Sequence, residues 1–424
     1  MSTLPSFLDA DLHGKTVLVR MDHNVVKNGK IKDPMRIDAT IPTLLHIYKK
    51  GGKPILMTHV GRPFDKKTGV ITIDAADGVE PIVKYIEEKL QLKGAIPDCT
   101  GNGAEGITDL APLGKAVQAL KDRQVDFVYL PNTRWFKGEE AKDEAADTLA
   151  KGLAALADVY VNDAFGSWQA HASTYNVTKF LPSYGGLLML KEIANLQKVF
   201  EPQRPLVSVV AGAKFDTKIG PLSSLIKLSD KLVLGGVLYN AYLCVKYQIQ
   251  IKGVGEDDLA LAQQFLRDVE PYQGRIVELP AIIESDSFEN ADTWRVHKVR
   301  DLKPGTVLNY VLDIAPESFA DEAVKGVFTS AQTIFVNAVM GYTALFTEGT
   351  KAMYALIDSC SQAEKLFGGG DTIQDFRDLL PGIFAKAANN PHYYFFTGGG
   401  AILDAIVSGS PYGMKPVRAL MPQA

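Results

Sequence analysis

Two lysines stand four residues apart directly after an apolar stretch, and their spacing suggests chemistry. Leu206 to Val210 is short, apolar and β-branched without a helical period, which indicates a buried parallel strand. Gly212 and Ala213 follow, and Lys214 and Lys218 then lie where a helix should begin. Such a turn presents free N–H groups and the positive end of the helix dipole, which favour phosphate. Taken alone, two solvated lysines on an ordinary strand–helix turn would be the simpler explanation.

Four arginines and two histidines stand at or beyond the ends of successive predicted strands in the first half of the chain. The strands are expected at Val17–Asp22, Pro54–Val60, Phe127–Asn132 and Asp158–Asp163. At or beyond their ends stand Arg20, Asp22, Asn24 and Arg36, then His59, Gly61 and Arg62, then Asn132 and Arg134, and last Asn162, Asp163 and His171. Because ligands of open α/β sheets bind beyond the carboxyl ends of the strands, these side chains should share one edge. One such arginine is usually a surface charge, but four indicate a bidentate cradle for phosphate or carboxylate.

Small residues follow the strands expected in the second half. These strands are predicted at Leu206–Val210, Lys231–Leu234, Arg275–Leu279, Val307–Ile314, Thr333–Val336, Lys365–Phe367 and Tyr393–Phe396. Their ends carry Gly235-Gly236, Ala315-Pro316, Ala338 to Gly341, Gly368 to Thr372 and Thr397 to Ala401. Small residues let a ligand approach the backbone, and Asp371 at a helix start can hold Mg²⁺ on a nucleotide. One glycine triplet is ordinarily a flexible turn, yet two in one sheet, together with Lys214 and Lys218, favour a nucleotide site.

Helices alternate with these strands, which predicts parallel sheets covered on both faces. In the first half they are expected at Pro42–Lys50, Gly78–Gln91 and Glu139–Ala157. Leu181 to Gly186 has the composition of a turn, and Leu187–Phe200 is an unbroken amphipathic helix. The sequence therefore predicts an α/β protein with two doubly wound, Rossmann-like domains joined by a helix. One lobe would hold a small anion and the other a nucleotide, and phosphoryl transfer would require them to close.

Two glycine-containing stretches imitate nucleotide motifs without the right context. Gly14-Lys15-Thr16 resembles the end of a P-loop, but Asp9 stands where the first glycine is required and the strand follows it. Gly101 to Gly106 matches a dinucleotide fingerprint by letter, yet only the weak strand Ala95 to Pro97 precedes it, and Pro112 interrupts the helix it should open. We reject the first motif and interpret the second stretch as a loop.

Composition argues against several classes of function. A chain of 424 residues should contain two or three domains, and its net charge of -4 does not suggest nucleic acid as a partner. Cys99, Cys244 and Cys360 have no metal or disulfide spacing, which is typical of a reducing compartment. Met1 to Asp11 lacks a signal-peptide pattern, and no run of about 18 apolar residues occurs. We therefore expect a cytoplasmic protein without a membrane or nucleic-acid partner.

Several stretches carry the ordered motifs of a known family. They are Val19 to Asn24, Thr58 to Pro63, Asn132 to Phe136, Val161 to Gly166 with Ala170 to Thr174, Ala211 to Lys218, Leu312 to Pro316, Gly368 to Thr372 and Thr397 to Ala401. With these motifs the chain resembles phosphoglycerate kinase over nearly its whole length. The resemblance implies reversible phosphoryl transfer between 1,3-bisphosphoglycerate and Mg-ADP, giving 3-phosphoglycerate and ATP, by a phosphotransferase with a carboxyl group as acceptor. No covalent intermediate is expected in such a transfer.

The resemblance also implies roles for single residues. The glycerate and its 3-phosphate would be held by Asp22, Asn24, Arg36, His59, Arg62 and Arg134. The moving phosphoryl group would be neutralised by Arg36 and Lys214, with backbone amides near Gly370, Gly398 and Gly399. The nucleotide would be bound by Gly212, Ala213, Lys214, Lys218, Gly236, Asn337, Gly369, Gly370, Asp371 and Thr372, with Mg²⁺ on Asp371.

A division into domains follows from the same resemblance. Residues 1–184 would form the 3-phosphoglycerate domain, with the C-terminal segment 404–424 packed back on it. Residues 185–201 would form the connecting helix and residues 202–403 the nucleotide-binding domain. The implied partners are 3-phosphoglycerate and ATP or ADP, and a monomer is expected.

Both ends of the implied site depart from the family pattern. The family normally has His-Arg before Ala170-His171, where this chain has Trp168 and Gln169, so one substrate-phosphate arginine is missing. The glutamate that would take the ribose hydroxyls is replaced by Ala344. Two alternatives therefore stay open, namely a kinase of the same fold with a changed anion or nucleotide preference, and a weakly active or non-catalytic nucleotide-binding relative. Against the second stands the retention of the charged residues Arg36, Lys214, Lys218 and Asp371.

Overall fold

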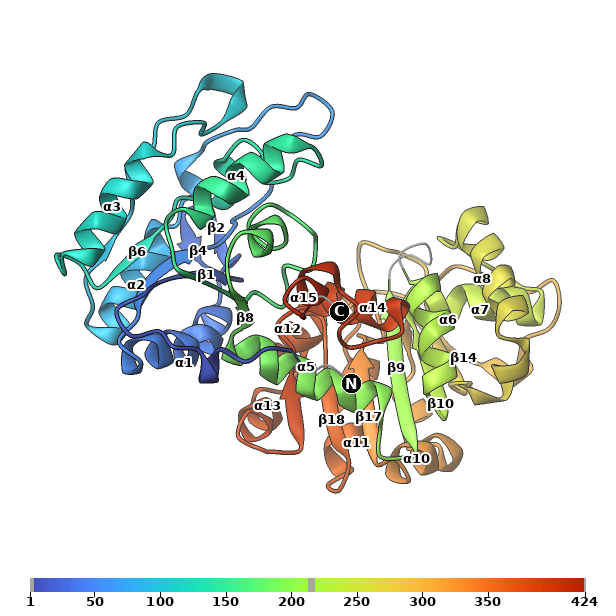
Figure 1. Cartoon of the computed structure of the whole chain (residues 1–424). Helices are drawn as coiled ribbons and strands as arrows, with labels where there is room; N and C mark the ends of the chain where they lie inside the picture. Colours follow the sequence, from blue (N-terminus) through green and yellow to red (C-terminus); the bar gives the residue numbers. More distant parts are fainter. Residues whose placement is uncertain (1–3, 213–217, 423–424) are drawn as a thin grey trace. The chain divides into compact units, whose positions relative to one another are not determined.

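The chain divides into two compact units, each built around its own parallel sheet. The computed structural model describes residues 4–212 and 218–422, and all structural statements below concern these residues. The first unit comprises Met1–Ile193 with Tyr412–Ala424, and the second comprises Ala194–Pro411 (Figure 1). Each unit contains a six-stranded sheet in which every pairing is parallel. The predicted α/β fold with two Rossmann-like parallel sheets is confirmed.

The sheet of the first unit has the strand order β5-β6-β4-β1-β7-β8. Its strands are β1 Thr16–Met21, β4 Lys53–Met57, β5 Gly94–Ala95, β6 Phe127–Tyr129, β7 Val159–Asp163 and β8 Ser183–Gly185. The helices are α1 Met35–Lys49, α2 Glu80–Leu90, α3 Ala111–Lys121, α4 Glu144–Ala154, the start of α5 Leu187–Phe200, and α15 Lys415–Arg418. A small hairpin, β2 Val26–Lys27 with β3 Lys30–Ile31, follows β1.

Strand β1 lies between β4 and β7 and is buried along its whole length. Alternate residues from Val17 to Met21 belong to the core that the sheet shares with α1 and α2. Because side chains alternate across a strand, Arg20 points to the opposite face of the sheet. Its register partners are Met57 on β4 and Asn162 on β7. The three strands therefore end side by side, which aligns the loops that follow them.

Helix α1 begins earlier than the sequence predicts. It starts at Met35 and contains Pro42, which the sequence analysis places at its first position. Asp33 accepts a hydrogen bond from the Met35 N–H at 3.0 Å, and Pro34 precedes the helix. This start signal outweighs the single hydrogen bond that an internal proline removes. As a result Arg36 lies in the first turn of a helix and not in a loop.

Helix α4 begins later than predicted. Asp143 accepts a hydrogen bond from the Ala145 N–H at 2.9 Å and caps the helix, so that its first residue is Glu144 and not Glu139. Good helix formers precede the cap, and for this reason the predicted helix begins too early. Helix propensity alone carries little information about where a helix starts. Glu139 and Glu140 consequently belong to the loop between β6 and α4.

Two other elements of the first unit differ from the prediction. Ser183–Gly185 forms β8 and pairs in parallel with β7, although its composition suggests a turn. Helix α3 begins at Ala111 with Pro112 in its first turn, where proline is tolerated, so Pro112 does not interrupt a helix. The stretch before it contains only a 3₁₀ turn over Gly103–Glu105, so its interpretation as a loop is confirmed.

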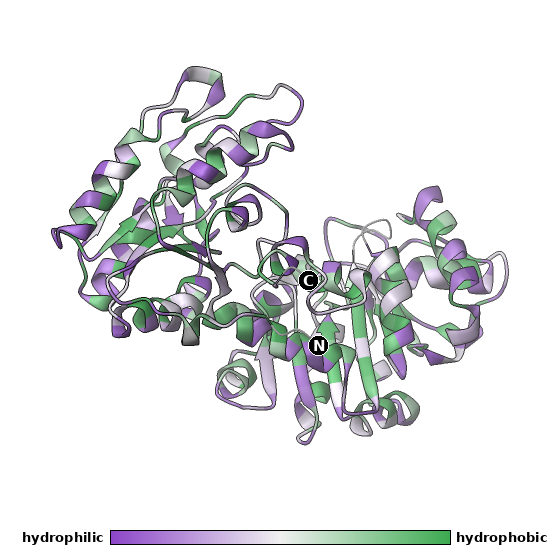
Figure 2. Cartoon of the chain, viewed as in Figure 1, coloured by the Kyte–Doolittle hydropathy of each residue, from purple (hydrophilic) through white to green (hydrophobic). Residues whose placement is uncertain are grey.

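The second unit has a sheet in the order β12-β10-β9-β17-β18-β19. These strands are β9 Leu206–Gly212, β10 Lys231–Gly235, β12 Ile276–Val277, β17 Thr333–Asn337, β18 Glu364–Phe367 and β19 Tyr393–Phe395. The helices are α6 Ile219–Leu228, α7 Gly236–Tyr247, α8 Glu256–Asp268, α9 Glu317–Ala320, α10 Glu322–Thr329, α11 Glu348–Ser359, α12 Gly370–Leu379, α13 Pro381–Ala387 and α14 Gly399–Ser408. Hydrophobic residues are concentrated in the strands, as β9 shows clearly in Figure 2. No helix of the described residues is long and apolar enough to cross a membrane.

One predicted strand of the second unit belongs to a different sheet. Val307–Ile314 is divided into β15 Val307–Leu308, which pairs with β11 Gln250–Ile251, and β16 Tyr310–Ile314. Strand β16 pairs antiparallel with β13 Ala281–Ser285, which in turn pairs antiparallel with β14 Trp294–Lys298. An apolar, β-branched run is compatible with a parallel or an antiparallel sheet, so the sequence pattern does not reveal the direction in which the strand pairs. The prediction of a single parallel sheet for this half was wrong at this point.

Asp163 connects the end of β7 to the start of α5. It is fully buried, and its Oδ1 accepts a hydrogen bond from the Met189 N–H at 3.0 Å. A Cβ at Gly186 would lie 2.3 Å from the same oxygen, so only glycine fits this turn. Burial raises the pKa of Asp163 to about 6, although hydrogen bonds from Thr43 and the N–H groups of Met189 and Leu188 oppose the shift. Asp163 is therefore a structural residue of the helix start and not part of an anion cradle.

We expect Asp163→Asn to remove a pH-dependent loss of stability. The folded protein keeps the proton of Asp163 up to about pH 6, whereas the unfolded chain loses it near the ordinary value of 3.8. Stability from this group is therefore present below about pH 4 and is lost as the pH rises through about 6. Urea denaturation should show that the free energy of unfolding of the wild type falls by about 3 kcal/mol relative to that of the variant between about pH 4 and pH 6. A difference that stays constant with pH would contradict the shift.

Candidate active site

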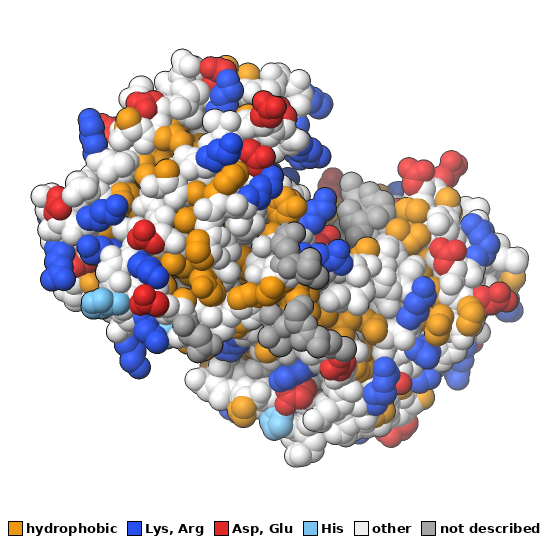
Figure 3. Space-filling model, viewed as in Figure 1, with side chains coloured by type: hydrophobic (Ala, Val, Ile, Leu, Met, Phe, Trp, Pro, Cys, Tyr) orange, Lys and Arg blue, Asp and Glu red, His pale blue; other side chains and the backbone are white. Residues whose placement is uncertain are grey.

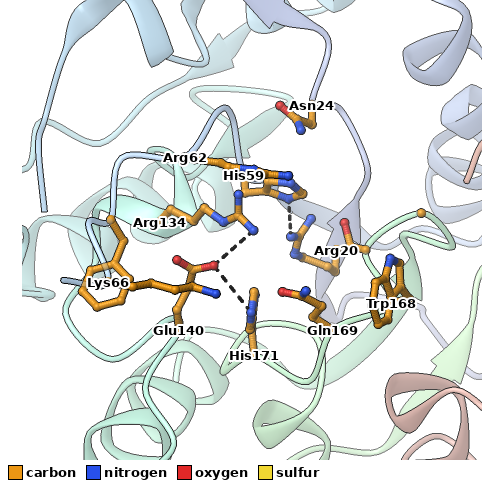
Figure 4. A pocket seen from close by; sticks show the side chains of 13 residues that line it. Arg20, Asn24, His59, Arg62, Lys66, Arg134, Glu140, Trp168, Gln169 and His171 are labelled. Carbon is orange, nitrogen blue, oxygen red and sulfur yellow. Dashed lines mark hydrogen bonds and ion pairs between the residues drawn. The ribbon is translucent and has the colours of Figure 1, made fainter. Parts of the chain in front are cut away.

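A cavity of about 330 Å³ lies at the ends of the strands of the first unit (Figure 4). Among the side chains that line it are Arg20, Asn24, His59, Arg62, Arg134 and His171, all of which the sequence places at or beyond strand ends. Phe64, Lys66, Glu140 and the segment 166–169 complete the wall. The expectation that parallel strands bring these residues together is met by the structure.

Arg20 is held in place by a chain of buried polar groups. Its Nε donates to Ser173 Oγ at 2.9 Å, and its Nη1 donates to the Met21 carbonyl. Ser173 in turn donates from its hydroxyl to Glu139 Oε1 at 2.5 Å and from its N–H to Glu139 Oε2 at 3.0 Å. Arg20, Ser173 and Glu139 are each at most 1% exposed. A charge buried to this extent must be paired, so this network sets the direction in which Arg20 faces the cavity.

His59 is neutral and its tautomer follows from its contact with Arg20. Nη2 of Arg20 lies 2.9 Å from His59 Nδ1. Because a guanidinium can only donate, Nδ1 accepts and the ring proton resides on Nε2. Burial, followed by the positive charges of Arg20 and Arg134, holds the pKa of His59 well below its ordinary value. His59 therefore offers a neutral N–H donor to an anion in the cavity.

Glu140 brings the cavity a negative charge next to Arg134. Its Oε1 lies 3.1 Å from Arg134 Nη2 and 3.6 Å from His171 Nε2. Arg134 also donates from Nη1 to the Gly61 carbonyl at 2.6 Å, while its buried Nε has no hydrogen-bond partner among the described residues. Burial lowers the pKa of His171 to about 4, although Glu140 opposes the shift. The cavity is thus positively charged through arginine and lysine and not through histidine.

Asp22 and Arg36 form an ion pair beside the cavity. The Arg36 Nη1 lies 3.3 Å from Asp22 Oδ2, and Asp22 is buried while Arg36 is partly exposed. Neither side chain lines the cavity itself. Asn24 does line it, and its Oδ1 accepts a hydrogen bond from the Gly61 N–H at 3.0 Å. Asp22 therefore positions Arg36, and Asn24 positions the loop that carries Arg62.

Asn132 and Asn162 are buried connectors and do not line the cavity. Asn132 Oδ1 accepts from the N–H groups of Val60 and Arg134, each at 3.1 Å, and its Nδ2 donates to the Val60 carbonyl at 2.7 Å. It thereby joins the loops after β4 and β6. Asn162 Oδ1 accepts from the Ala164 N–H at 3.0 Å. Both residues shape the loops that present the charged side chains.

Lys66 and Glu140 line the cavity but are absent from the residues selected by sequence. Glu140 falls inside the helix predicted over Glu139–Ala157, which concealed it. Lys66 lies in the loop between β4 and the 3₁₀ turn Ala75–Asp77, beyond the segment that a strand-end rule covers. The signal available for Lys66 was its place four residues after Arg62, in a loop that starts at the same strand end.

The strand ends of the second unit pack so closely that glycine is required. A Cβ at Gly236 would lie 2.9 Å from the Gly212 carbonyl oxygen, and Gly236 has φ 59°. A Cβ at Gly399 would lie 2.6 Å from the Gly369 Cα, so the two glycine triplets touch. Helices α12 and α14 begin at Gly370 and Gly399. Their first N–H groups lack partners within the helices and are suited to phosphate oxygens.

Lys218 reaches the same strand ends. Its Nζ donates to Asn337 Oδ1 at 2.6 Å, and Asn337 Nδ2 donates to the Gly368 carbonyl at 2.7 Å. Burial lowers the pKa of Lys218, and the charge of Asp371 opposes this shift. Thr372 is buried in the first turn of α12. Ala213 and Lys214 lie outside the described residues.

The loop after β17 carries Ala344 in place of a carboxylate. Its neighbour Thr343 hydrogen-bonds to Asp375, a bond that lowers the pKa of Asp375 against the larger effect of burial, which raises it. Glu348 Oε1 lies 2.7 Å from Lys351 Nζ and begins α11. Tyr342 is exposed and stacks on Phe288, with ring centroids 4.5 Å apart. No carboxylate of this loop between Ala338 and Thr347 is therefore available to bind a ribose.

Asp371 is the residue that the sequence predicts to bind Mg²⁺. No group of three or more His, Cys, Asp or Glu side chains in residues 4–212 and 218–422 is arranged to hold a metal. Mg²⁺ in nucleotide sites is commonly held by one or two carboxylates together with substrate phosphates. Asp371 in the first turn of α12, electrostatically coupled to Lys218, fits that arrangement.

Comparison with known proteins gives matches over nearly the whole chain. The family model described as phosphoglycerate kinase matches residues 7–409. A phosphoglycerate kinase from Roseiflexus sp. (strain RS-1) is 36% identical over 404 residues, covering 94% of this chain and 95% of the relative. One from Methylorubrum extorquens is 34% identical over 419 residues, covering 96% of both.

Solved structures agree with this result. The structure of phosphoglycerate kinase from Coxiella burnetii matches with a TM-score of 0.78 at 25% identity and covers 99% of each chain. Phosphoglycerate kinase from Pyrococcus horikoshii OT3 has the same fold, with a TM-score of 0.77 at 21% identity and 98% coverage of each chain. Fold, ordered motifs and full-length sequence similarity lead to one conclusion. This chain belongs to the phosphoglycerate kinase family.

Proposed function

We propose that this protein catalyses reversible phosphoryl transfer between 1,3-bisphosphoglycerate and Mg-ADP, giving 3-phosphoglycerate and ATP. The acceptor in the reverse direction is then a carboxyl group, and the reaction is a step of glycolysis and gluconeogenesis. The observation that carries the proposal is the cavity at the strand ends of the first unit, which Arg20, Arg62, Lys66 and Arg134 line together with one carboxylate, Glu140. This excess of positive charge suits a phosphate dianion in a chain of this family.

In this proposal the first unit holds the glycerate and its 3-phosphate. The contacts would come from Asp22, Asn24, Arg36, His59, Arg62 and Arg134. Residues 1–184, with segment 404–424 packed on them, would be the substrate domain, and residues 185–201 the connecting helix. In support, residues 412–422 group with the first unit, and α5 runs across the division between the units, whereas residues 404–411 group with the second unit.

The second unit, residues 202–403, would bind the nucleotide with Mg²⁺ on Asp371. The nucleotide contacts would come from Gly212, Ala213, Lys214, Lys218, Gly236, Asn337, Gly369, Gly370, Asp371 and Thr372. Arg36, Lys214 and the amides near Gly370 and Gly399 would neutralise the transferred phosphoryl group. Transfer needs in-line positioning and exclusion of water, so the units should close when both substrates bind, which small-angle scattering would detect.

The same proposal includes a cytoplasmic monomer whose partners are small molecules. Acidic and basic side chains are interspersed over the face seen in Figure 3, in keeping with the net charge of -4, and this arrangement does not favour nucleic acid. Ala344 supports a second candidate, a kinase of the same chemistry that tolerates other nucleosides. A coupled assay with 3-phosphoglycerate and MgATP, repeated with a panel of nucleoside triphosphates, tests the function and separates the candidates. Absence of turnover with every nucleotide would overturn both.

Arg36→Ala and Lys214→Ala should each lower kcat far more than they raise the KM for nucleotide. Both charges are proposed to stabilise the moving phosphoryl group, and removal of one such donor costs roughly 3–4 kcal/mol, or about 10²–10³ in kcat. Steady-state kinetics with matched controls, Lys49→Ala and Lys227→Ala at exposed positions of α1 and α6, make the comparison. An unchanged kcat in either site variant would refute its role.

Gly399→Ala should weaken nucleotide binding, because its Cβ would lie 2.6 Å from the Gly369 backbone and separate the two glycine loops. We expect the KM for MgATP to rise by about tenfold or more while affinity for 3-phosphoglycerate stays near that of the wild type. Gly382→Ala in α13, where a Cβ meets nothing within 4 Å, is the control. Equal nucleotide affinities in the two variants would show that the close approach does not shape the site.

ADP and 2′-deoxy-ADP should be used almost equally well. Charge-assisted hydrogen bonds from ribose hydroxyls to a carboxylate contribute about 1.5–3 kcal/mol each, and Ala344 cannot accept them. Adenine and its apolar surroundings must then supply most of the affinity. We expect the two KM values to differ by less than about threefold, and Ala344→Glu to increase the difference. A penalty of about tenfold in the wild type, about 1.4 kcal/mol, would show that another group binds the ribose.

A further inference from the structure

We infer that Lys66 is a substrate-contacting residue that supplies the positive charge missing from the loop after β7, and that it determines affinity for the phosphate end of the substrate. This inference rests on the proposed function, since it names a further residue of the same site. It follows from three features of the cavity. The loop after β7 contributes no positive charge to it, hydrogen bonds fix the turn that carries Lys66, and Lys66 has no ion-pair partner among the described residues.

The wall formed by the loop after β7 carries no positive charge at neutral pH. This loop contributes Ser167, Trp168, Gln169 and His171 to the cavity, with Trp168 and Gln169 where the family pattern has His-Arg. His171 is neutral there because burial depresses its pKa. A phosphate in the cavity would meet arginines from the loops after β1, β4 and β6 and only neutral donors from this one.

Lys66 lies in a turn that hydrogen bonds to Asp65 hold in place. Asp65 Oδ1 accepts from the Lys67 N–H at 2.8 Å, and its Oδ2 accepts from the Thr68 hydroxyl at 2.9 Å. The Asp65 N–H donates to the Val70 carbonyl at 2.9 Å, and the Gly69 N–H donates to the Asp65 carbonyl at 2.8 Å. These bonds fix the direction of the chain at Lys66, which lines the cavity as Figure 4 shows.

The charge of Lys66 acts on the wall that lacks an arginine. Burial is the main cause of the depressed pKa of His171, and the Lys66 ammonium group adds to it after Arg134 and Arg20, so the two side chains that line the cavity are electrostatically coupled. Glu140 is already within 4 Å of Arg134 and His171, and no ion pair to Lys66 occurs in the described parts of the chain. Lys66 is therefore a positive charge at the cavity that an incoming phosphate can bind without displacing a protein partner.

Lys67 provides the comparison that separates this role from a solvated surface charge. It is the next residue in the same turn and is also exposed, yet it does not line the cavity. A nonspecific effect of positive charge would make the two lysines equivalent. A direct contact requires that only Lys66 matter.

The test compares Lys66→Ala with Lys67→Ala in the full chain. Isothermal titration with 3-phosphoglycerate should show about tenfold weaker binding for Lys66→Ala and no change for Lys67→Ala. In a Gln169→Arg background, where the arginine is restored, Lys66→Ala should cost less than about threefold, because the two cations serve the same phosphate. Equal affinities of the two alanine variants would overturn the inference.

Inorganic sulfate titrated into the same variants keeps this test independent of the reaction. It reproduces the charge and shape of a phosphate group, so Lys66→Ala should weaken its binding and Lys67→Ala should not. Failure of the wild type to turn over 3-phosphoglycerate would refute the proposed function, while the sulfate comparison would still decide the role of Lys66. Sulfate binding that is unchanged in Lys66→Ala would refute that role.

Discussion

The buried guanidinium of Arg20 is the constraint on which the site of the first unit depends. Arg20 lies near the carboxyl end of the central strand β1 and is only 1% exposed. An unpaired charge buried at this position would cost several kcal/mol. Ser173 and the Met21 carbonyl accept from one side of the guanidinium and His59 accepts from the other, while Ser173 donates in turn to Glu139. The loops after β4, β6 and β7 are thereby tied to a single charge, which explains why their side chains converge. The same contact assigns the tautomer of His59 and keeps that ring neutral.

The second unit brings its functional groups together through closely packed backbone instead of through long side chains. Gly236 packs against Gly212, and Gly399 against Gly369, so backbone segments at the ends of different strands approach one another closely. Lys218 and Asn337 bridge two strand ends by hydrogen bonds. One unit thus presents long charged side chains and the other presents backbone N–H groups, which matches the difference between a small anion and a nucleotide phosphate chain.

Much of this arrangement could be predicted from the sequence because it follows from one rule about parallel strands. Arg20 lies at the end of β1, and His59, Arg62 and Arg134 each follow a strand within a few residues, so the rule brings them together without any knowledge of contacts. The bounds of α5, Leu187–Phe200, were also predicted, since its amphipathic period is unbroken.

The failures have physical causes of a different kind. The start of α1 depends on Asp33-Pro34 and that of α4 on Asp143, and such caps compete with propensity over a few residues. The antiparallel pairing of β16 with β13 depends on long-range contacts that no local pattern contains. Lys66 and Glu140 approach the cavity from loops whose course is set by Asp65 and by the cap of α4. Their role therefore becomes visible only in three dimensions.

A crystal structure of the protein with 3-phosphoglycerate tests the central claim most directly, because it locates the phosphate group itself. The account predicts phosphate oxygens within hydrogen-bonding distance, roughly 3 Å, of Arg62, Arg134 and Lys66, with Gln169 facing the same group. Phosphate bound outside the cavity at the ends of β1, β4 and β6, or a cavity that stays empty at saturating 3-phosphoglycerate, would contradict it.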